Sequence, residues 1–98
     1  MNGPDYAARA AAGARFLDGK LPGWAGRIDL EQLDMSNCHR CILGQLAGRY
    51  DDALDDFGIS GADDIQLGFM TMAGAWRELS EAWAGEITRR REPAQVTA

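Results

Sequence analysis

Three apolar stripes at helical spacing constrain the fold of this chain more than any other feature of its sequence. Apolar side chains three or four residues apart lie on one face of an α-helix, so each stripe predicts an amphipathic helix. The stripes are Tyr6, Ala10, Ala14, Leu17 and Leu21; Ile42, Leu46, Tyr50, Leu54 and Phe57; and Met72, Trp76, Leu79, Trp83 and Ile87. Together they predict an all-α fold with a core of adequate but marginal size, in which the tryptophans are core residues.

The ends of the first and last helices are predicted from capping and helix-breaking residues. Pro4 suits the first helical position, and Pro22-Gly23 breaks the chain after the helix. Thr71 is expected to cap the last helix, which ends at Glu92-Pro93. A short strand over Arg27–Leu30 is a minor alternative, because one strand without a partner is not stable.

The central helix is expected to begin at Cys38, after the N-cap residues Ser36 and Asn37, and to run for about five turns. Gly58 is well placed as its C′ residue. Four aspartates crowd its negative C-terminal end, which is unfavourable for the helix dipole; they are Asp51, Asp52, Asp55 and Asp56. Two explanations stay open: the helix stops near Tyr50 and restarts, or the carboxylates are retained for a contact.

Length and composition place these helices in one domain. The chain has 98 residues, with 46 % hydrophobic and 26 % charged residues, which is typical of a globular domain. We expect a small single-domain bundle of three main helices plus short helical turns over residues 1–92, and a disordered C-terminal tail over residues 93–98. No apolar run approaches the roughly 20 residues of a membrane span, and no signal peptide is visible. A cytoplasmic protein without membrane contact is expected.

The acidic charge is concentrated in one stretch. The net charge is −5, and Asp51–Asp64 holds six aspartates and no basic residue. This balance argues against nucleic-acid binding, which normally needs a basic face. The stretch is either a solvated edge of the domain or a surface that steers a partner protein. A DNA-mimic inhibitor is a weaker alternative, because six acids are few beside the one charge per ~1.7 Å of B-DNA.

The segment Cys38-His39-Arg40-Cys41 has three interpretations. A Cys-x-x-Cys pair supplies two of the four ligands of a zinc site, but the chain has no second pair, so a full site would need a homodimer or carboxylate ligands. A redox dithiol would normally follow a strand, which is not evident here. The third interpretation is two reduced thiols that pack as small apolar side chains.

Gly44 and Gly48, with Ala47 between them, form a small-residue face on the central helix, away from its apolar stripe. Each glycine costs roughly 1 kcal/mol inside a helix, which indicates a close approach by another segment. That segment is either part of the same chain or a docked partner. Trp-lined ligand boxes, phosphate-binding glycine loops and Ser/His/acid sets are not indicated, so no catalytic residue and no cofactor is expected.

Part of the sequence resembles a known set of proteins. The residues that carry the resemblance are Pro22-Gly23-Trp24, Arg27-Ile28-Asp29-Leu30, Leu33-Asp34-Met35, Cys41-Ile42-Leu43-Gly44-Gln45-Leu46, Gly48, Tyr50, Gly68-Phe69, Leu79, Ala82-Trp83 and Ile87. Over residues 13–91 the chain is similar to small uncharacterised proteins of actinobacteria and their bacteriophages. The resemblance implies a phage or prophage accessory protein in the cytoplasm of a host bacterium, and it implies no reaction.

These observations together predict a non-enzymatic protein that binds and modulates a host or phage protein. Asp51, Asp52, Asp55 and Asp56 are the residues expected to steer the partner, and Gly44 and Gly48 those expected to allow close docking. The alternatives are a zinc- or thiol-dependent module centred on Cys38 and Cys41, in which two chains form a dimer, and the DNA-mimic inhibitor.

Overall fold

A computed structural model describes residues 5–61, 63–71 and 74–91 of the chain. Its elements, in chain order, are α1 (Tyr6–Lys20), the 3-10 helix η1 (Trp24–Arg27), α2 (Ile42–Ala47), α3 (Tyr50–Phe57), α4 (Asp63–Gln66) and α5 (Trp76–Arg91). The described residues contain no strand, so the predicted all-α class is confirmed and the alternative strand over Arg27–Leu30 is not formed. The expected tail over residues 93–98 lies outside the described residues, as do Pro4 and Met72.

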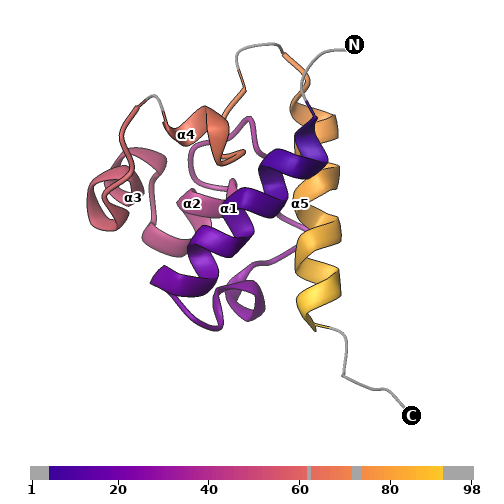
Figure 1. Ribbon diagram of the computed structural model, residues 1–98, viewed down its shortest axis with the longest axis horizontal. Helices are drawn as coiled ribbons and strands as arrows, with labels where there is room; N and C mark the ends of the chain where they lie inside the picture. The colour runs from indigo at the N-terminus through magenta and orange to yellow at the C-terminus, as the bar shows by residue number, and fades with distance from the viewer. Residues whose placement is uncertain (1–4, 62, 72–73, 92–98) are drawn as a thin grey trace.

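The two long helices, α1 and α5, pack side by side (Figure 1). α1 begins where the Asp5 side chain accepts a hydrogen bond from the Ala8 amide at 3.0 Å, which satisfies one of the free N–H groups of its first turn. The apolar stripes of both helices face the core as predicted. Ala10, Ala14, Leu17, Leu79, Trp83 and Ile87 are all 0 % exposed.

Aromatic rings fill the space between these helices and the loops. Trp83 meets Trp24 edge to face at 5.7 Å and stacks on Phe69 at 5.4 Å, centroid to centroid. Its indole N–H is also satisfied, since it donates to the Gly68 carbonyl at 2.6 Å. Trp24 and Trp83 are therefore core residues as predicted, whereas Trp76 is only half-buried.

The helix start predicted at Thr71 is wrong. α5 begins at Trp76, five residues later. Thr71 is buried, and its hydroxyl shares a hydrogen bond with the Tyr6 hydroxyl at 3.1 Å. A threonine before an apolar stripe resembles an N-cap in sequence, but here it ties the chain to the start of α1.

The central stripe forms two helices rather than one. α2 ends at Gly48, whose φ of 91° suits glycine alone, and α3 restarts at Tyr50. The Tyr50 amide donates to the Cys38 carbonyl at 3.0 Å, so the first residue of α3 is bonded to the turn that precedes α2. The prediction of a continuous helix from Cys38 is wrong, and the alternative of a break near Tyr50 is confirmed. Gly58 ends α3 with a φ of 70°, as expected.

The break also changes the electrostatics of the helix. Asp51 and Asp52 now lie in the first turn of α3, where the helix dipole favours negative charge. Only Asp55 and Asp56 remain near its negative end. Two of the four carboxylates therefore have a structural explanation that a single long helix did not offer.

The long connection between η1 and α2 is held by Gln45 of α2. Its side-chain oxygen accepts from the Asp29 amide at 2.7 Å, and its amide nitrogen donates to the carbonyls of Asp29 at 3.2 Å and Arg40 at 2.9 Å. The Met35 amide donates to the Ser80 hydroxyl of α5 at 3.0 Å. These bonds fix the connection where it passes α5 and α2.

Candidate functional site

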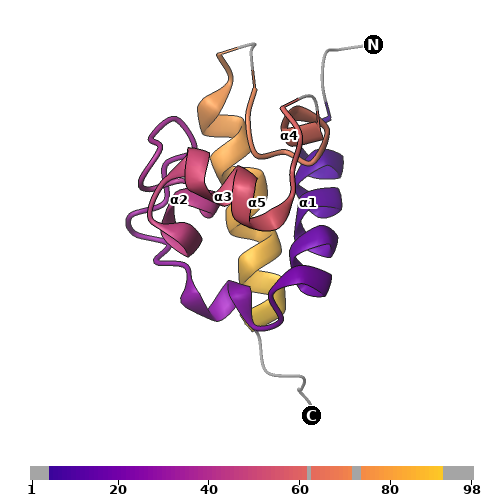
Figure 2. The same ribbon diagram turned by 90° about the vertical axis from the view of Figure 1, so that its left-hand side faces the viewer.

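α3 presents an acidic face at the edge of the molecule. Tyr50, Ala53, Leu54 and Phe57 pack toward the core, while the carboxylates project into solvent. The acidic face consists of Asp51, Asp52, Asp55 and Asp56, all exposed. Figure 1 shows α3 at the left edge of the fold, on the side away from α5, and in Figure 2 this side faces the viewer. The four residues expected to steer a partner are thus brought onto one side of one helix.

Little positive charge offsets this face. Arg49 lies 3.8 Å from the Asp51 carboxylate, and both side chains are more than half exposed, at 58 % and 77 %. Such an exposed pair contributes only about 0–1 kcal/mol. Among the described residues, the other three carboxylates form no ion pair. The negative field of the face is therefore available to a partner.

The expected docking role of Gly44 does not fit the packing. Gly44 is buried, and a Cβ added there would overlap the Cys38 carbonyl oxygen and come within 2.8 Å of the His39 Cα. The close approach that the glycine indicated is made by the chain's own turn over residues 38–39. Gly48 is exposed with open space around it, and its role is to end α2. Gly44 therefore does not contribute to the candidate surface.

The two cysteines have different environments. Cys41 is buried, and its Sγ accepts a hydrogen bond from the Gly44 amide at 3.2 Å, so it caps α2. Burial raises the pKa of the Cys41 thiol, which keeps it protonated and poorly nucleophilic. Cys38 is exposed. The Nδ1 atom of His39 makes a hydrogen bond with the Gly48 carbonyl at 2.9 Å.

No described residues assemble a metal site around these cysteines. Within the ranges that the structure describes, no group of three or more histidine, cysteine or carboxylate side chains converges. The zinc alternative would therefore need ligands from a second chain. The raised pKa of Cys41 also disfavours the thiol-dependent alternative.

An open apolar pocket of about 240 Å³ lies beside the start of α3. We call it the Trp76 groove. Its walls come from the segment before α2, from Tyr50 of α3, from the segment after α4 and from the start of α5; the side chains that shape it are Met35, Cys38, Tyr50, Phe69, Met70 and Trp76. This groove could not be predicted from the sequence, because Trp76 belongs to a core stripe and the two methionines lie far apart along the chain.

A buried carboxylate lies next to the Tyr50 hydroxyl. Asp64 of α4 is 4 % exposed, and the Tyr50 hydroxyl donates to its Oδ2. Burial, and then the bond to Asp64, raise the pKa of the Tyr50 hydroxyl well above its usual range, so it stays a donor. The other oxygen, Oδ1, has no partner in the part of the chain that the structure describes. Six aspartates in one stretch look alike in sequence, and only the tertiary fold separates this buried one.

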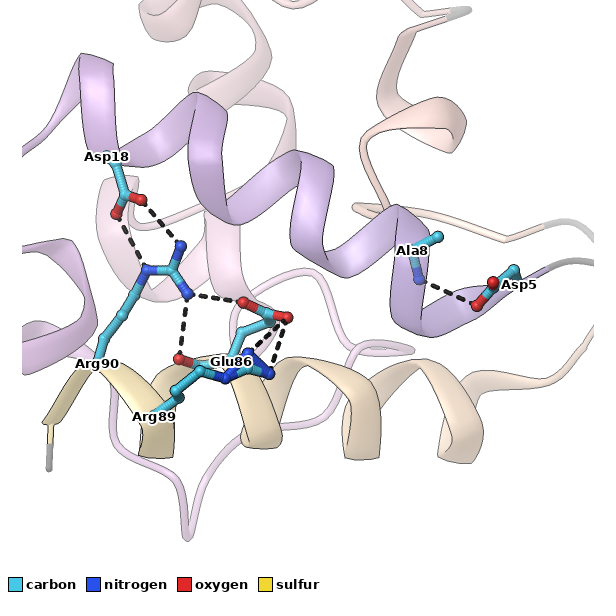
Figure 3. A network of polar contacts seen from close by, with 6 residues as sticks. All are labelled: Asp5, Ala8, Asp18, Glu86, Arg89 and Arg90. Carbon is cyan, nitrogen blue, oxygen red and sulfur yellow. Dashed lines mark hydrogen bonds and ion pairs between the residues drawn. The ribbon is translucent and has the colours of Figure 1, made fainter.

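The charged cluster at the C-terminal end of α5 is structural. Arg90 donates to both oxygens of Asp18, at 3.1 and 2.9 Å, and to the buried Glu86 carboxylate at 2.6 Å (Figure 3). Its guanidinium also lies 5.8 Å from the Trp24 ring centroid. Arg91 donates to the carbonyls of Ala25 and Ile28. Arg90 and Arg91 are thus used inside the fold.

No family model, curated protein or solved structure matches this chain. None of the described helices is long and apolar enough to cross a membrane. We therefore base the functional proposal on the acidic face of α3 and the groove beside it.

Proposed function

We propose that this chain is a non-enzymatic accessory protein of phage or prophage type that binds and modulates a host or phage protein in the cytoplasm of the host bacterium. The observation that carries the proposal is the acidic face of α3, with four exposed carboxylates and one weak ion pair. Opposite charges on two protein surfaces speed their association and favour the correct partner over wrong ones. The expected partner therefore presents a basic surface.

The sequence resemblance to actinobacterial and phage proteins supports the setting. The fold supports a binding role because α3 is held at both ends. Its first residue, Tyr50, bonds to Asp64 and to the Cys38 carbonyl, and Gly58 closes its last turn. A helix fixed in this way presents its charges in one geometry, which reduces the entropy cost of binding.

The DNA-mimic alternative is less well supported by the geometry. α3 has eight residues, so it is about 12 Å long at roughly 1.5 Å per residue. Duplex DNA of that length carries about seven phosphate charges, at one per ~1.7 Å. Four carboxylates on one helix face reproduce about half of that density, which suits a basic protein patch better than a DNA-binding groove.

The test is capture of partners from an actinobacterial lysate with three immobilised forms of the protein. The first is the wild type, and the second replaces the acidic face by asparagine (D51N, D52N, D55N and D56N). The matched control removes the same number of charges from exposed acids elsewhere, through E31Q, D63N, E78Q and E81Q. None of these control residues forms an ion pair among the described residues.

We expect the wild type and the control to retain one stoichiometric partner, and the acidic-face variant to lose it. Folding should survive the change, because the loss of favourable charge at Asp51 and Asp52 offsets the relief at Asp55 and Asp56, each about 0.3–1 kcal/mol. Circular dichroism checks this point. Equal retention of every bound protein by all three forms would refute the role of the acidic face.

A further inference from the structure

We infer that the Trp76 groove holds one apolar side chain of a peptide segment whose neighbouring residues are arginine or lysine. This inference rests on the proposed function, since it gives the basic partner a second point of contact. It commits to a partner segment that joins one apolar anchor to positive charge.

The size of the groove favours a single side chain. Its volume is about 240 Å³, below the roughly 300–1,000 Å³ of pockets that enclose whole small molecules. The groove is also open to solvent, as a peptide backbone passing over it requires.

The chemistry of the walls favours an apolar anchor. The half-buried Met70 and Trp76 offer an adaptable thioether side chain and a ring surface, while Met35 and Phe69, also in the lining, are buried core residues. Tryptophan and tyrosine are enriched at the sites where binding energy concentrates in protein interfaces. The Tyr50 hydroxyl is already committed to Asp64, so it does not need a polar ligand.

Charge at the rim supplies the second half of the specificity. Tyr50 lines the groove and is also the first residue of α3, so the acidic face begins at the next residue. The five residue steps from Asp51 to Asp56 span about 8 Å of helix axis at roughly 1.5 Å per residue. An extended peptide covers that distance in two to three residues at about 3.3 Å each. Two or three basic residues beside the anchor would therefore match the length of the acidic face.

The opposite rim does not compete for the basic residues. Beyond Trp76 and Ser36 lies a shallow hollow that contains Glu31, Asp34, Arg40 and Arg77, with two charges of each sign. The charges that line this hollow balance, so the hollow does not favour basic residues over acidic ones as the α3 side does.

A second copy of this chain is a poor occupant. The chain carries a net charge of −5, so two copies repel. Its one run of basic residues is Arg89–Arg91, where Arg90 and Arg91 are engaged within the fold. Self-association through the groove is an outcome that the experiment must be able to show.

The test measures binding of fluorescein-labelled synthetic peptides to the full chain by fluorescence anisotropy. The probe has one leucine between two pairs of arginines. A second peptide replaces the leucine by serine, and a third replaces the arginines by glutamine. The exposed Cys38 allows a pair of groove variants, in which C38F fills the pocket and C38S leaves it open. A second pair separates charge effects, with D51N/D52N at the rim and E78Q/E81Q on α5.

We expect the leucine peptide to bind the wild type, and to bind C38S far more tightly than C38F, because serine leaves the pocket open. Burial of one leucine side chain corresponds to about tenfold to a hundredfold in affinity, so the serine peptide and the C38F variant should each lose that much. D51N/D52N should weaken binding several-fold at low salt, and E78Q/E81Q should not. The leucine peptide should also slow alkylation of Cys38 in the wild type, which tests the site without any substitution.

Three results would overturn the inference. The first is equal affinity for the leucine and serine peptides, and the second is no binding at about 1 mM peptide, where even a weak site fills. The third is a change in oligomeric state of the C38F variant, measured by sedimentation, with peptide binding unchanged, because the occupant would then be a second copy. None of these affects capture by the acidic face, so the proposed function would stand or fall on the lysate experiment.

Discussion

Substitution of Gly13 by alanine is expected to destabilise the fold, although alanine is the better helix former. Gly13 lies in the middle of α1, where α4 and α5 approach the helix. A Cβ there would overlap the Leu67 carbonyl oxygen and come within 2.8 Å of the Trp83 ring. Neither neighbour can move easily, because the Leu67 atom is a backbone carbonyl oxygen and the Trp83 side chain is fully buried and donates a hydrogen bond to the Gly68 carbonyl.

The magnitude follows from two opposing terms. Overpacking of a core costs about 1–3 kcal/mol and more where backbone must move, and this overlap belongs at the upper end. The gain in helix propensity from glycine to alanine is roughly 1 kcal/mol. The net loss is about 2 kcal/mol, which corresponds to a fall in Tm of roughly 8–16 °C for a domain of this size.

Gly19 provides the matched control in the same helix. An added Cβ there meets nothing within 4 Å, so G19A should gain propensity without a clash and stabilise by about 0.5–1 kcal/mol. Thermal unfolding of the three proteins, followed by circular dichroism, measures both effects. If G13A were as stable as G19A, the close packing of α1 against α4 and Trp83 would be refuted.

Three further predictions concern polar contacts of the core and the candidate surface. R90A should lose roughly 2 kcal/mol, because it removes the charge-assisted bonds to Asp18 and to the buried Glu86; the exposed R77A should change stability by less than about 0.5 kcal/mol. The hydrogen bond from Arg90 lowers the pKa of Asp18, so the stability that this bond contributes is complete above about pH 4 and is lost as the pH falls further through the lowered pKa. The difference in free energy of unfolding between wild type and R90A, measured in urea, should therefore shrink in acid. A constant difference would contradict this prediction. Y50F should lower the free energy of unfolding by about 1–3 kcal/mol, because it leaves the buried Asp64 carboxylate without its donor, whereas Y50F/D64L should recover most of that loss in the same assay. Additive losses in the double variant would show that Tyr50 and Asp64 do not interact. A thiol reagent should modify Cys38 in the native protein and Cys41 only in denaturant; equal native rates would show that Cys41 is not capped and buried.

The sequence was sufficient to predict the helical class and the inward faces of the long helices. Ala10, Ala14 and Leu17 in α1, and Leu79 and Trp83 in α5, repeat at helical spacing because burial there follows the helix period. The boundaries were harder to predict. A local pattern places Thr71 before an apolar stripe, but its hydrogen bond to Tyr6 is made between segments 65 residues apart.

The candidate site was predicted in part. The four acids of α3 lie together because they are neighbours in one helix, which sequence alone can show. The role of Gly44 depends on the turn over residues 38–39, and the Trp76 groove joins four separate segments. Contacts of that kind depend on the tertiary fold, and no local spacing encodes them.

The most direct test of the proposed interaction is the association rate of the captured partner at two ionic strengths. The wild type, the acidic-face variant and the matched control are compared by stopped-flow mixing at about 0.03 and about 0.3 M salt, where the screening length falls from roughly 18 to 6 Å. We expect the acidic-face variant alone to associate about tenfold or more slowly at low salt, with the three rates converging at high salt. If the control variant slows as much as the acidic-face variant, net charge and not α3 directs the encounter. If neither variant slows, the acidic face has no part in binding.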